Sequence, residues 1–348
     1  MTIARFPRII SGILAGILVL AVFPARACDV CAIYVATEVA QSRTGFRLGV
    51  WEQWSHNTTE RLNGRTIPSF GERLDSATTQ FLLGYQLNHR VGLQLTIPLI
   101  ARTWRRLENG RFEDGNVVGA GDLSLLGTVQ AYAYHDQRNS LLLNVIGGLK
   151  LPSGNPDLLA EELAPPSGTP GPGVPLRGVP QHSTGGGDDD HDDVPGRRLF
   201  GGIHGHDLAL GSGSVDGILG SSVYASRDRF FMTAVVQYAI RREGAFGYQF
   251  ANDLTWFGGP GWYPLLNHRY TLGLQMVLSG EAKGKDTQMG ERLDDTALTA
   301  LYFGPGVRFT WTTQLSAEFY ADLPVLLNNT ALQTLPTFRL RGGLVWRF

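Results

Sequence analysis

The most constraining feature of this sequence is the alternation along its last twelve residues, 337–348. Apolar and aromatic side chains occupy one parity, and they are Phe338, Leu340, Leu344, Trp346 and Phe348. The opposite parity carries cations, which are Arg339, Arg341 and Arg347. Because alternate side chains of a strand point to opposite faces, this strand would have one apolar face and one charged face. Such a strand suits a barrel with lipid outside and water inside.

The same period of two recurs along the chain. It is clearest from residue 91 onward, where one face would carry Val91, Leu93, Leu95, Ile97 and Leu99. A helix would instead repeat its apolar residues at i, i+3 and i+4. The pattern predicts about twelve strands, near residues 44–57, 77–87, 91–104, 121–134, 139–152, 212–226, 229–242, 247–257, 269–282, 297–310, 312–326 and 336–348.

The predicted connections are of two kinds. Tight turns fall near residues 88–90, 135–138 and 227–229, and longer loops near 58–76, 105–120, 153–211, 283–296 and 327–335. Outer-membrane barrels have short periplasmic turns and longer extracellular loops. We therefore expect an all-β fold, a transmembrane antiparallel up-and-down β-barrel of about twelve strands, over residues 44–348. Two connections fit less well: the turn near 242–244 is short on the long-loop side, and 258–268 is long on the short-turn side.

A water-soluble β-sandwich is the main alternative, and it would expose its polar face instead. Charges near the strand centres share the polar parity; they are Arg47, Asp122, Lys150, Asp216, Asp253, Glu281, Arg308, Glu318, Asp322, Arg339 and Arg341. Tryptophans near strand ends suggest the aromatic girdles of a membrane protein; they are Trp51, Trp54, Trp104, Trp256, Trp311 and Trp346. Both observations favour the barrel.

The first residues predict export. Two arginines precede an apolar run at residues 9–23, and an Ala-Arg-Ala site follows at 25–27. This order matches a secretory signal, so we interpret residues 1–27 as a signal peptide. An uncleaved anchor helix is the alternative, but its apolar run is short for a span of about 20 residues. We therefore expect the cell outer membrane as the location and outer-membrane lipid as a partner.

A nucleic-acid partner is not expected. The net charge is -1, whereas proteins that bind nucleic acids usually carry a basic patch or stripe.

Three runs of residues resemble a known family. They are GAGDL at residues 119–123, GLKLPSG at 148–154 and LGSGSVD at 210–216. In order and spacing they are similar to the outer-membrane barrel family named for the phenol meta-cleavage pathway, whose members are described as transporters. The resemblance implies a barrel and transport across the outer membrane. It implies no set of binding residues.

The only two cysteines, Cys28 and Cys31, stand in a segment, residues 28–43, that we expect in the periplasm ahead of the barrel. In an oxidising compartment the simplest reading is a disulfide. Paired thiolates also suit copper(I) or zinc, and lipidation of Cys28 is a third reading. Covalent haem is not expected, because Ala32 stands where the attachment motif needs histidine.

Residues 153–211 form the expected long extracellular loop, rich in His, Asp, Gly and Pro. It contains four of the eight histidines, which are His182, His191, His204 and His206. Imidazole and carboxylate groups together suit zinc, copper or nickel, so a divalent metal ion is the one candidate cofactor. A solvated acidic loop with incidental histidines is the alternative reading.

Charged residues of the last three predicted strands are the candidate pore-lining groups, namely Arg308, Glu318, Asp322, Arg339 and Arg341. Up-and-down strands are neighbours, so these side chains should lie close together. Opposed charges across a narrow pore would set up a transverse field. Alternatively, they only pair and fill the interior, and the sequence leaves both readings open.

The sequence therefore predicts an outer-membrane channel for passive passage of small solutes or ions, since about twelve strands leave room for side chains and a narrow pore. The alternative is a metal-related accessory protein that binds Cu or Zn through the cysteine pair and the histidine-rich loop. An enzyme is not expected. Nucleophilic catalysis needs serine and histidine within hydrogen-bond reach, and no histidine falls mid-strand beside a serine.

Overall fold

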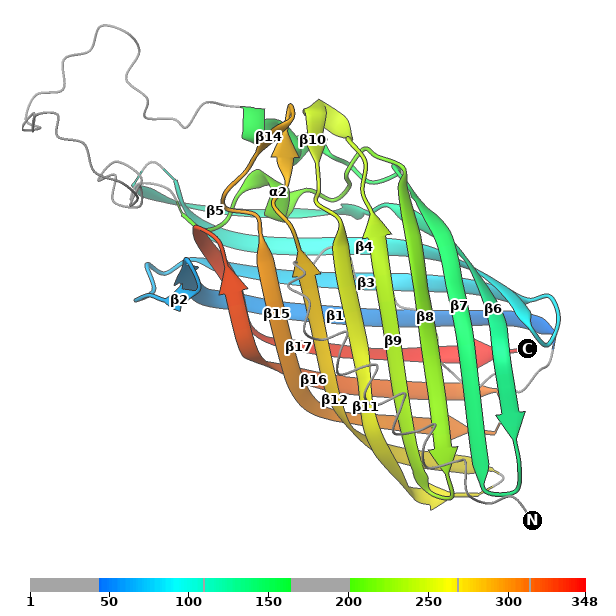
Figure 1. Cartoon of the computed structure of the whole chain (residues 1–348). Coiled ribbons are helices and arrows are strands. Elements are labelled where there is room, and N and C mark those ends of the chain that lie inside the picture. The colour runs from blue at the N-terminus through cyan, green and yellow to red at the C-terminus, as the bar shows by residue number, and fades with distance from the viewer. Residues whose placement is uncertain (1–43, 109, 164–200, 268, 313) are drawn as a thin grey trace, which may run out of the picture.

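The computed structural model describes residues 44–108, 110–163, 201–267, 269–312 and 314–348. Twelve antiparallel strands form a closed barrel (Figure 1), as the alternation predicts. The expected signal peptide, the segment 28–43 with Cys28 and Cys31, and both His182 and His191 lie outside the described residues. Within the described ranges, no helix is long and apolar enough to cross a membrane.

The barrel strands follow one another in an up-and-down order. They are β1 (Gly45–Leu62), β3 (Arg73–Gln86), β4 (Val91–Glu108), β6 (Leu123–His135), β7 (Asn139–Leu151), β8 (Asp216–Arg227), β9 (Phe230–Ile240), β11 (Asp253–Leu266), β12 (Tyr270–Lys283), β15 (Leu298–Trp311), β16 (Leu315–Asn329) and β17 (Leu332–Arg347). Pairing of β17 with β1, from Arg47 opposite Arg347 to Leu62 opposite Leu332, closes the cylinder.

Shorter elements occupy the connections at the end with the long loops. They are β2 (Arg65–Thr66), β5 (Arg111–Ala120), η2 (Asp157–Leu163), α2 (Gly205–Leu208), η4 (Ala245–Gly247), β10 (Tyr248–Gln249), β13 (Thr287–Gln288) and β14 (Glu291–Arg292). β5 pairs with the end of β4 and extends that hairpin past its neighbours. The sequence predicted a loop there.

The alternation of β12 shows why the chain folds this way. Leu274, Met276 and Leu278 are 44%, 44% and 42% exposed, respectively. Gln275 and Ser279 are buried in the interior. Burying the polar parity inside while the apolar parity faces outward is the pattern of an outer-membrane barrel, so the exposed parity is the surface that contacts lipid.

The position of β11 differs from the prediction. A strand was expected at 247–257, but β11 spans Asp253–Leu266. The glycine- and proline-rich stretch 258–261 interrupts the apolar pattern, yet pairing with β9 continues through it to Trp262. Consequently both connections that fitted poorly now fit, since three residues separate β11 from β12 and twelve separate β9 from β11.

The girdle interpretation is wrong for two tryptophans. Trp51 and Trp104 are only 4% and 7% exposed and belong to interior clusters. Trp311 and Trp346, by contrast, are 58% and 47% exposed at strand ends. Parity decides the difference, because the two buried rings fall on the inward face of their strands.

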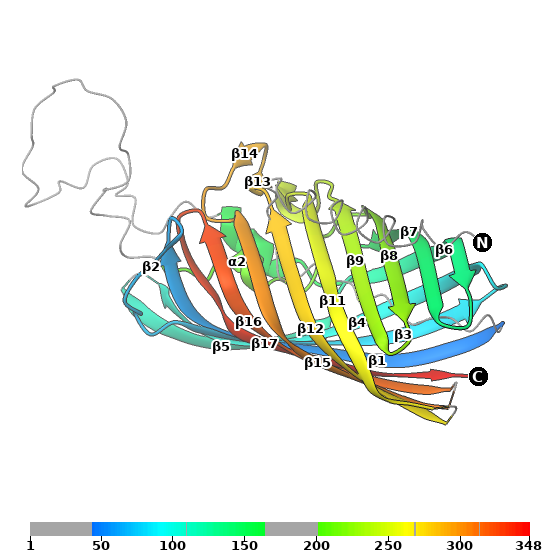
Figure 2. The same ribbon diagram turned by 60° about the horizontal axis from the view of Figure 1, so that its bottom comes forward.

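Part of the predicted extracellular loop lies inside the barrel. Residues 153–163 and 201–215, here called the plug, include η2 and α2, which lie between opposite walls at the long-loop end (Figure 2). Leu159 and Leu208 are fully buried, the latter against Leu74 and Trp104. The two ends of the long connection therefore contribute to the interior of the protein.

A charge on the outward face should destabilise the barrel. We expect Leu278→Arg, near the middle of β12, to lower the free energy of unfolding by about 2–4 kcal/mol, because an arginine would face hydrocarbon. Urea unfolding of protein refolded into lipid vesicles measures this, with Leu278→Met as the control. Equal stability of the arginine variant and the wild type would contradict lipid contact at this face.

Candidate functional site

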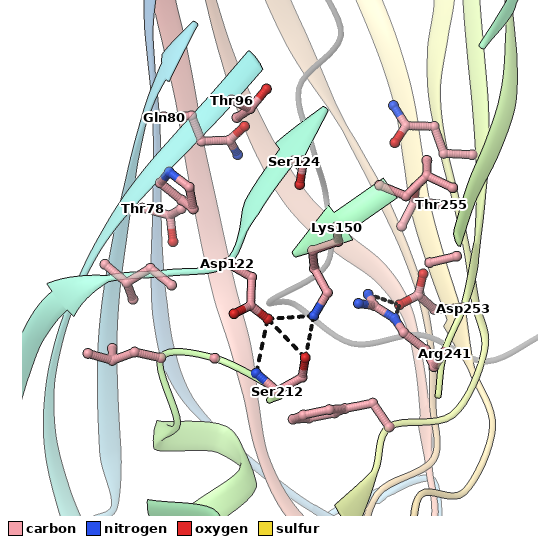
Figure 3. Close-up of a pocket in the computed structure, with 18 of the residues that line it drawn as sticks. Thr78, Gln80, Thr96, Asp122, Ser124, Lys150, Ser212, Arg241, Asp253 and Thr255 are labelled. Atoms are coloured by element: carbon pink, nitrogen blue, oxygen red, sulfur yellow. Dashed lines mark hydrogen bonds and ion pairs between the residues drawn. The ribbon is translucent and has the colours of Figure 1, made fainter. Parts of the chain in front are cut away.

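Asp122, which directly precedes β6, anchors the plug to the barrel. Its Oδ1 accepts the amide of Gly154 at 3.0 Å, and its Oδ2 accepts the amide and hydroxyl of Ser212 at 3.0 and 2.9 Å. Lys150 Nζ on β7 lies 2.6 Å from the same Oδ2 (Figure 3). One carboxylate thus holds both halves of the plug.

The network extends to two further carboxylates. Lys150 Nζ also contacts Asp216 at 2.8 Å. Arg241 pairs with Asp216 at 2.9 Å and with Asp253 at 2.7 Å. Two cations therefore neutralise most of the charge of three carboxylates (Asp122, Asp216 and Asp253), which leaves the group with one net negative charge.

The three runs that resemble the transporter family meet in this network. Asp122 belongs to the first, Lys150 to the second, and Ser212 to the third. The glycines of the runs allow backbones to touch: a Cβ on Gly154 would lie 2.9 Å from the Cα of Gly211. Larger residues at these two positions would push the plug away from the strand ends.

A second set of contacts holds the plug on the other side. Arg102 donates to the carbonyl of Ala209 at 2.7 Å, and Glu72 accepts the amide of Gly202 at 2.7 Å. Arg106 pairs with Glu161 of η2 at 2.8 Å. The plug is thus fixed by charged groups on strands β4 and β7, directly before β6 and directly before β3.

His204 and His206 lie within the plug. Their rings stack with centroids 5.6 Å apart. His206 Nδ1 lies 2.9 Å from Glu162, and its Nε2 lies 3.5 Å from Asp207. His204 Nε2 lies 3.3 Å from Asp295. Both histidines therefore contact carboxylates inside the protein.

The contact between His206 and Glu162 has the character of an ion pair. Burial alone would lower the pKa of His206, but the charges of Asp207, Glu162 and Asp295 raise it to about 10. Burial alone would raise the pKa of Glu162, but the charge and hydrogen bonds of His206 hold it at about 2. At neutral pH the plug therefore carries an imidazolium bound to a carboxylate.

Two cavities lie between the plug and the barrel wall. The first, the amide cavity, has walls that include Gln53, Thr78, Gln80, Thr96, Lys150, Ser212, Gln237, Arg241 and Thr255, and most of these are labelled in Figure 3. The second, the histidine cavity, has walls that include Gln53, Thr78, Arg102, His206, Lys283 and Thr334. The cavities are adjacent, because Gln53 and Thr78 line both.

The predicted pore-lining residues are brought together, and their side chains are buried inside the barrel. Arg308 pairs with Glu318 at 2.7 Å, and Arg341 with Asp322 at 2.7 Å. Arg339 pairs with Glu281, on β12, at 2.9 Å. We call this group the ion-pair belt: Glu281, Arg308, Glu318, Asp322, Arg339 and Arg341. None of these six lines either of the two cavities, so a role along the pore stays a prediction.

Aromatic rings support the belt. The Arg339 guanidinium lies 3.6 Å from the centroid of Tyr302, and that of Arg341 lies 4.6 Å from Phe257. Such cation–π contacts hold arginines in place beyond their ion pairs. Near the short turns, Phe231 and Tyr263 pack with centroids 4.4 Å apart. The alternation did not reveal this aromatic cluster, although its members fall on the inward parity.

The amide cavity was also missed. Its glutamines and threonines fall on the polar parity of their strands, but parity alone does not reveal which of them face a common space.

The predicted metal site is not formed by the described residues. In the described part of the chain, no three His, Cys, Asp or Glu side chains are grouped to hold an ion. Metal binding remains a prediction from sequence.

The closed barrel, with its apolar exterior and its paired charges inside, defines the class: this is an outer-membrane β-barrel. Among solved structures, an outer-membrane channel from Pseudomonas putida F1 has a similar fold, with a TM-score of 0.56, 15% identity, and coverage of 90% of this chain and 100% of that one. That similarity confirms the expected barrel type at the level of fold.

More distant barrels also align. The translocator domain of autotransporter NalP from Neisseria meningitidis has a TM-score of 0.39 and 12% identity, with 89% of this chain and 91% of that one covered. A Pseudomonas aeruginosa FadL homologue has a TM-score of 0.32 and 10% identity, with 94% and 95% covered. No protein-family model and no curated protein matches the sequence.

Asp122 should control how firmly the plug is held. Removing one partner of a buried ion pair costs about 3–5 kcal/mol, which corresponds to more than about 100-fold at 1.4 kcal/mol per tenfold. We therefore expect Asp122→Asn to accelerate hydrogen exchange at the amides of Gly154 and Ser212 about 100-fold, while the strands stay protected. Asp114→Asn, at an exposed position of β5, is the control. Unchanged exchange would show that other contacts suffice.

Docking of α2 should also depend on pH. His206 has its pKa raised from 6.5 to about 10, so its contribution is complete below pH 6.5 and is lost as pH rises through about 10. Glu162 has its pKa lowered from 4.5 to about 2, so its contribution is complete above pH 4.5 and is lost as pH falls through about 2. Docking should be strongest between about pH 4.5 and 6.5.

Hydrogen exchange at the Ala209 amide, which bonds Gly205 O, tests this. Its protection factor, corrected for intrinsic exchange at each pH, should fall between pH 6.5 and 10 in the wild type and stay flat in His206→Gln. A flat profile in the wild type would contradict the ion pair.

Proposed function

We propose that this protein is an outer-membrane channel for passive passage of small solutes or ions, with its path running beside the plug. The observation that carries the proposal is the pair of adjacent cavities that share Gln53 and Thr78. A barrel built only for structural support would gain stability by packing this space. The polar side chains in the walls instead suit water and dissolved molecules.

We also place the ion-pair belt along the path. Arg341 is the Cα partner of Gln53 across β17 and β1, so the belt adjoins the wall of both cavities. Its charges are held by ion pairs and rings, which makes their field fixed rather than fluctuating. Fixed charges beside a pore control which ions pass. This extends the proposal to Arg308, Glu318, Asp322, Arg339 and Arg341 as pore-lining residues.

A metal-related accessory role has less support. His204 and His206 contact carboxylates within the plug, and the remaining candidate ligands lie outside the described residues. We propose no catalytic activity, and we propose no resident cofactor.

Single-channel recording in planar lipid bilayers tests the channel. We expect step-like currents from the wild type, and longer open times in Asp122→Asn, because a loosened plug obstructs the path less. Arg341→Gln should shift the reversal potential in a salt gradient toward cation selectivity, because Asp322 loses a counter-charge. Arg138→Gln, in an exposed turn, is the control.

The outcomes separate the parts of the proposal. A bilayer that stays silent for both wild type and Asp122→Asn would overturn the channel. Currents whose selectivity is unchanged in Arg341→Gln would remove the belt from the path and leave the channel standing.

A further inference from the structure

We infer that the amide cavity binds a small uncharged solute rich in hydroxyl groups, of the sugar or polyol class. The inference rests on the proposed channel and deepens it, because it names the chemical class of the solute that would bind within the channel.

The polar part of the wall is made of amides and hydroxyls. They come from six strands, and they are Gln53, Thr78, Gln80, Thr96, Ser124, Gln237 and Thr255; Figure 3 labels Thr78, Gln80, Thr96, Ser124 and Thr255. An amide offers both donors and acceptors, and a hydroxyl offers both from one atom. A solute hydroxyl has the same double character, so it can either donate to or accept from groups of this kind.

The charged part of the wall is paired internally, because each of its carboxylates contacts Lys150 or Arg241. Lys150 and Arg241 each contact two carboxylates within 2.6–2.9 Å. A charged solute would leave water for a cavity whose cations are committed to other partners, and burial of a charge without a partner is costly. An anion would also meet the net negative charge of the network. Small hydrated inorganic ions can pass such a space without binding there.

The remaining wall is apolar. Pro98, Ile100, Leu210, Ile218 and Phe250 also line the cavity. A sugar carries C–H groups on its ring faces and hydroxyls at its rim, so it can use both kinds of wall at once.

Equilibrium binding to the detergent-solubilised full chain tests the inference without requiring a current. Titration calorimetry would compare D-glucose with two charged compounds of matched size, D-glucuronate and D-glucosamine. The detergent must lack a sugar headgroup, so an amine oxide is used. We expect heat of binding with glucose and much weaker or no binding with the two charged compounds.

Variants locate the site. Gln80→Leu with Gln237→Leu should weaken glucose binding about tenfold or more, because each amide loses hydrogen bonds to the solute. Thr255→Val keeps the side-chain shape but removes the hydroxyl, so it should weaken glucose binding several-fold. This single variant tests the site even if the double variant does not refold. Gln314→Leu, at an exposed position in a turn, is the matched control.

Each outcome decides. Preference for glucose that is lost in the cavity variants and kept in Gln314→Leu supports the inference. No glucose binding, equal or tighter binding of glucuronate or glucosamine, or glucose binding that the cavity variants leave unchanged would overturn it. Bilayer currents without glucose binding would overturn the inference alone, whereas glucose binding with a silent bilayer would overturn the channel alone.

Discussion

Pairing of β1 with β17 is the contact on which the rest of the molecule depends. In hydrocarbon no water is available to unpaired backbone groups, so a sheet can span a bilayer only when it closes on itself. Closure fixes two surfaces at once. The apolar parity of every strand faces lipid, and the polar parity faces an enclosed interior in which charges must find partners. The ion-pair belt and the Asp122 network are both consequences of that enclosure, since each places carboxylates against arginines or lysines rather than leaving a charge isolated.

The plug divides the interior of the barrel. It is attached through side chains of several strands and through close backbone contact at Gly154 and Gly211, so it belongs to the folded barrel rather than to its surroundings. The two cavities exist because the plug occupies only part of the cross-section. The amides and hydroxyls in their walls, and the charges that are paired beside them, lead to the proposed channel and to an uncharged solute within it.

Much of the fold could be predicted from the sequence, because parity is a local signal that each strand carries by itself. The strand number, the closed barrel and the inward direction of residues such as Arg308 and Glu318 follow from it. Parity fails where the pattern is interrupted, as in the glycine- and proline-rich part of β11. It also cannot distinguish an inward aromatic ring from one at the membrane interface, as Trp51 shows. The plug and the cavities depend on contacts between residues far apart in the chain, such as Asp122 with Ser212, and no local period encodes those.

Direct contact between the two halves of the plug affects where this chain can accept insertions. Asn155 O accepts the amides of both Leu210 and Gly211, at 3.1 and 3.0 Å, so the first half of the plug is bonded directly to the second although the two are far apart in the sequence. Because closing a longer loop costs only slightly more entropy, this contact depends little on the number of residues between the two halves. Insertions between them should therefore leave the contact, and with it the barrel, in place.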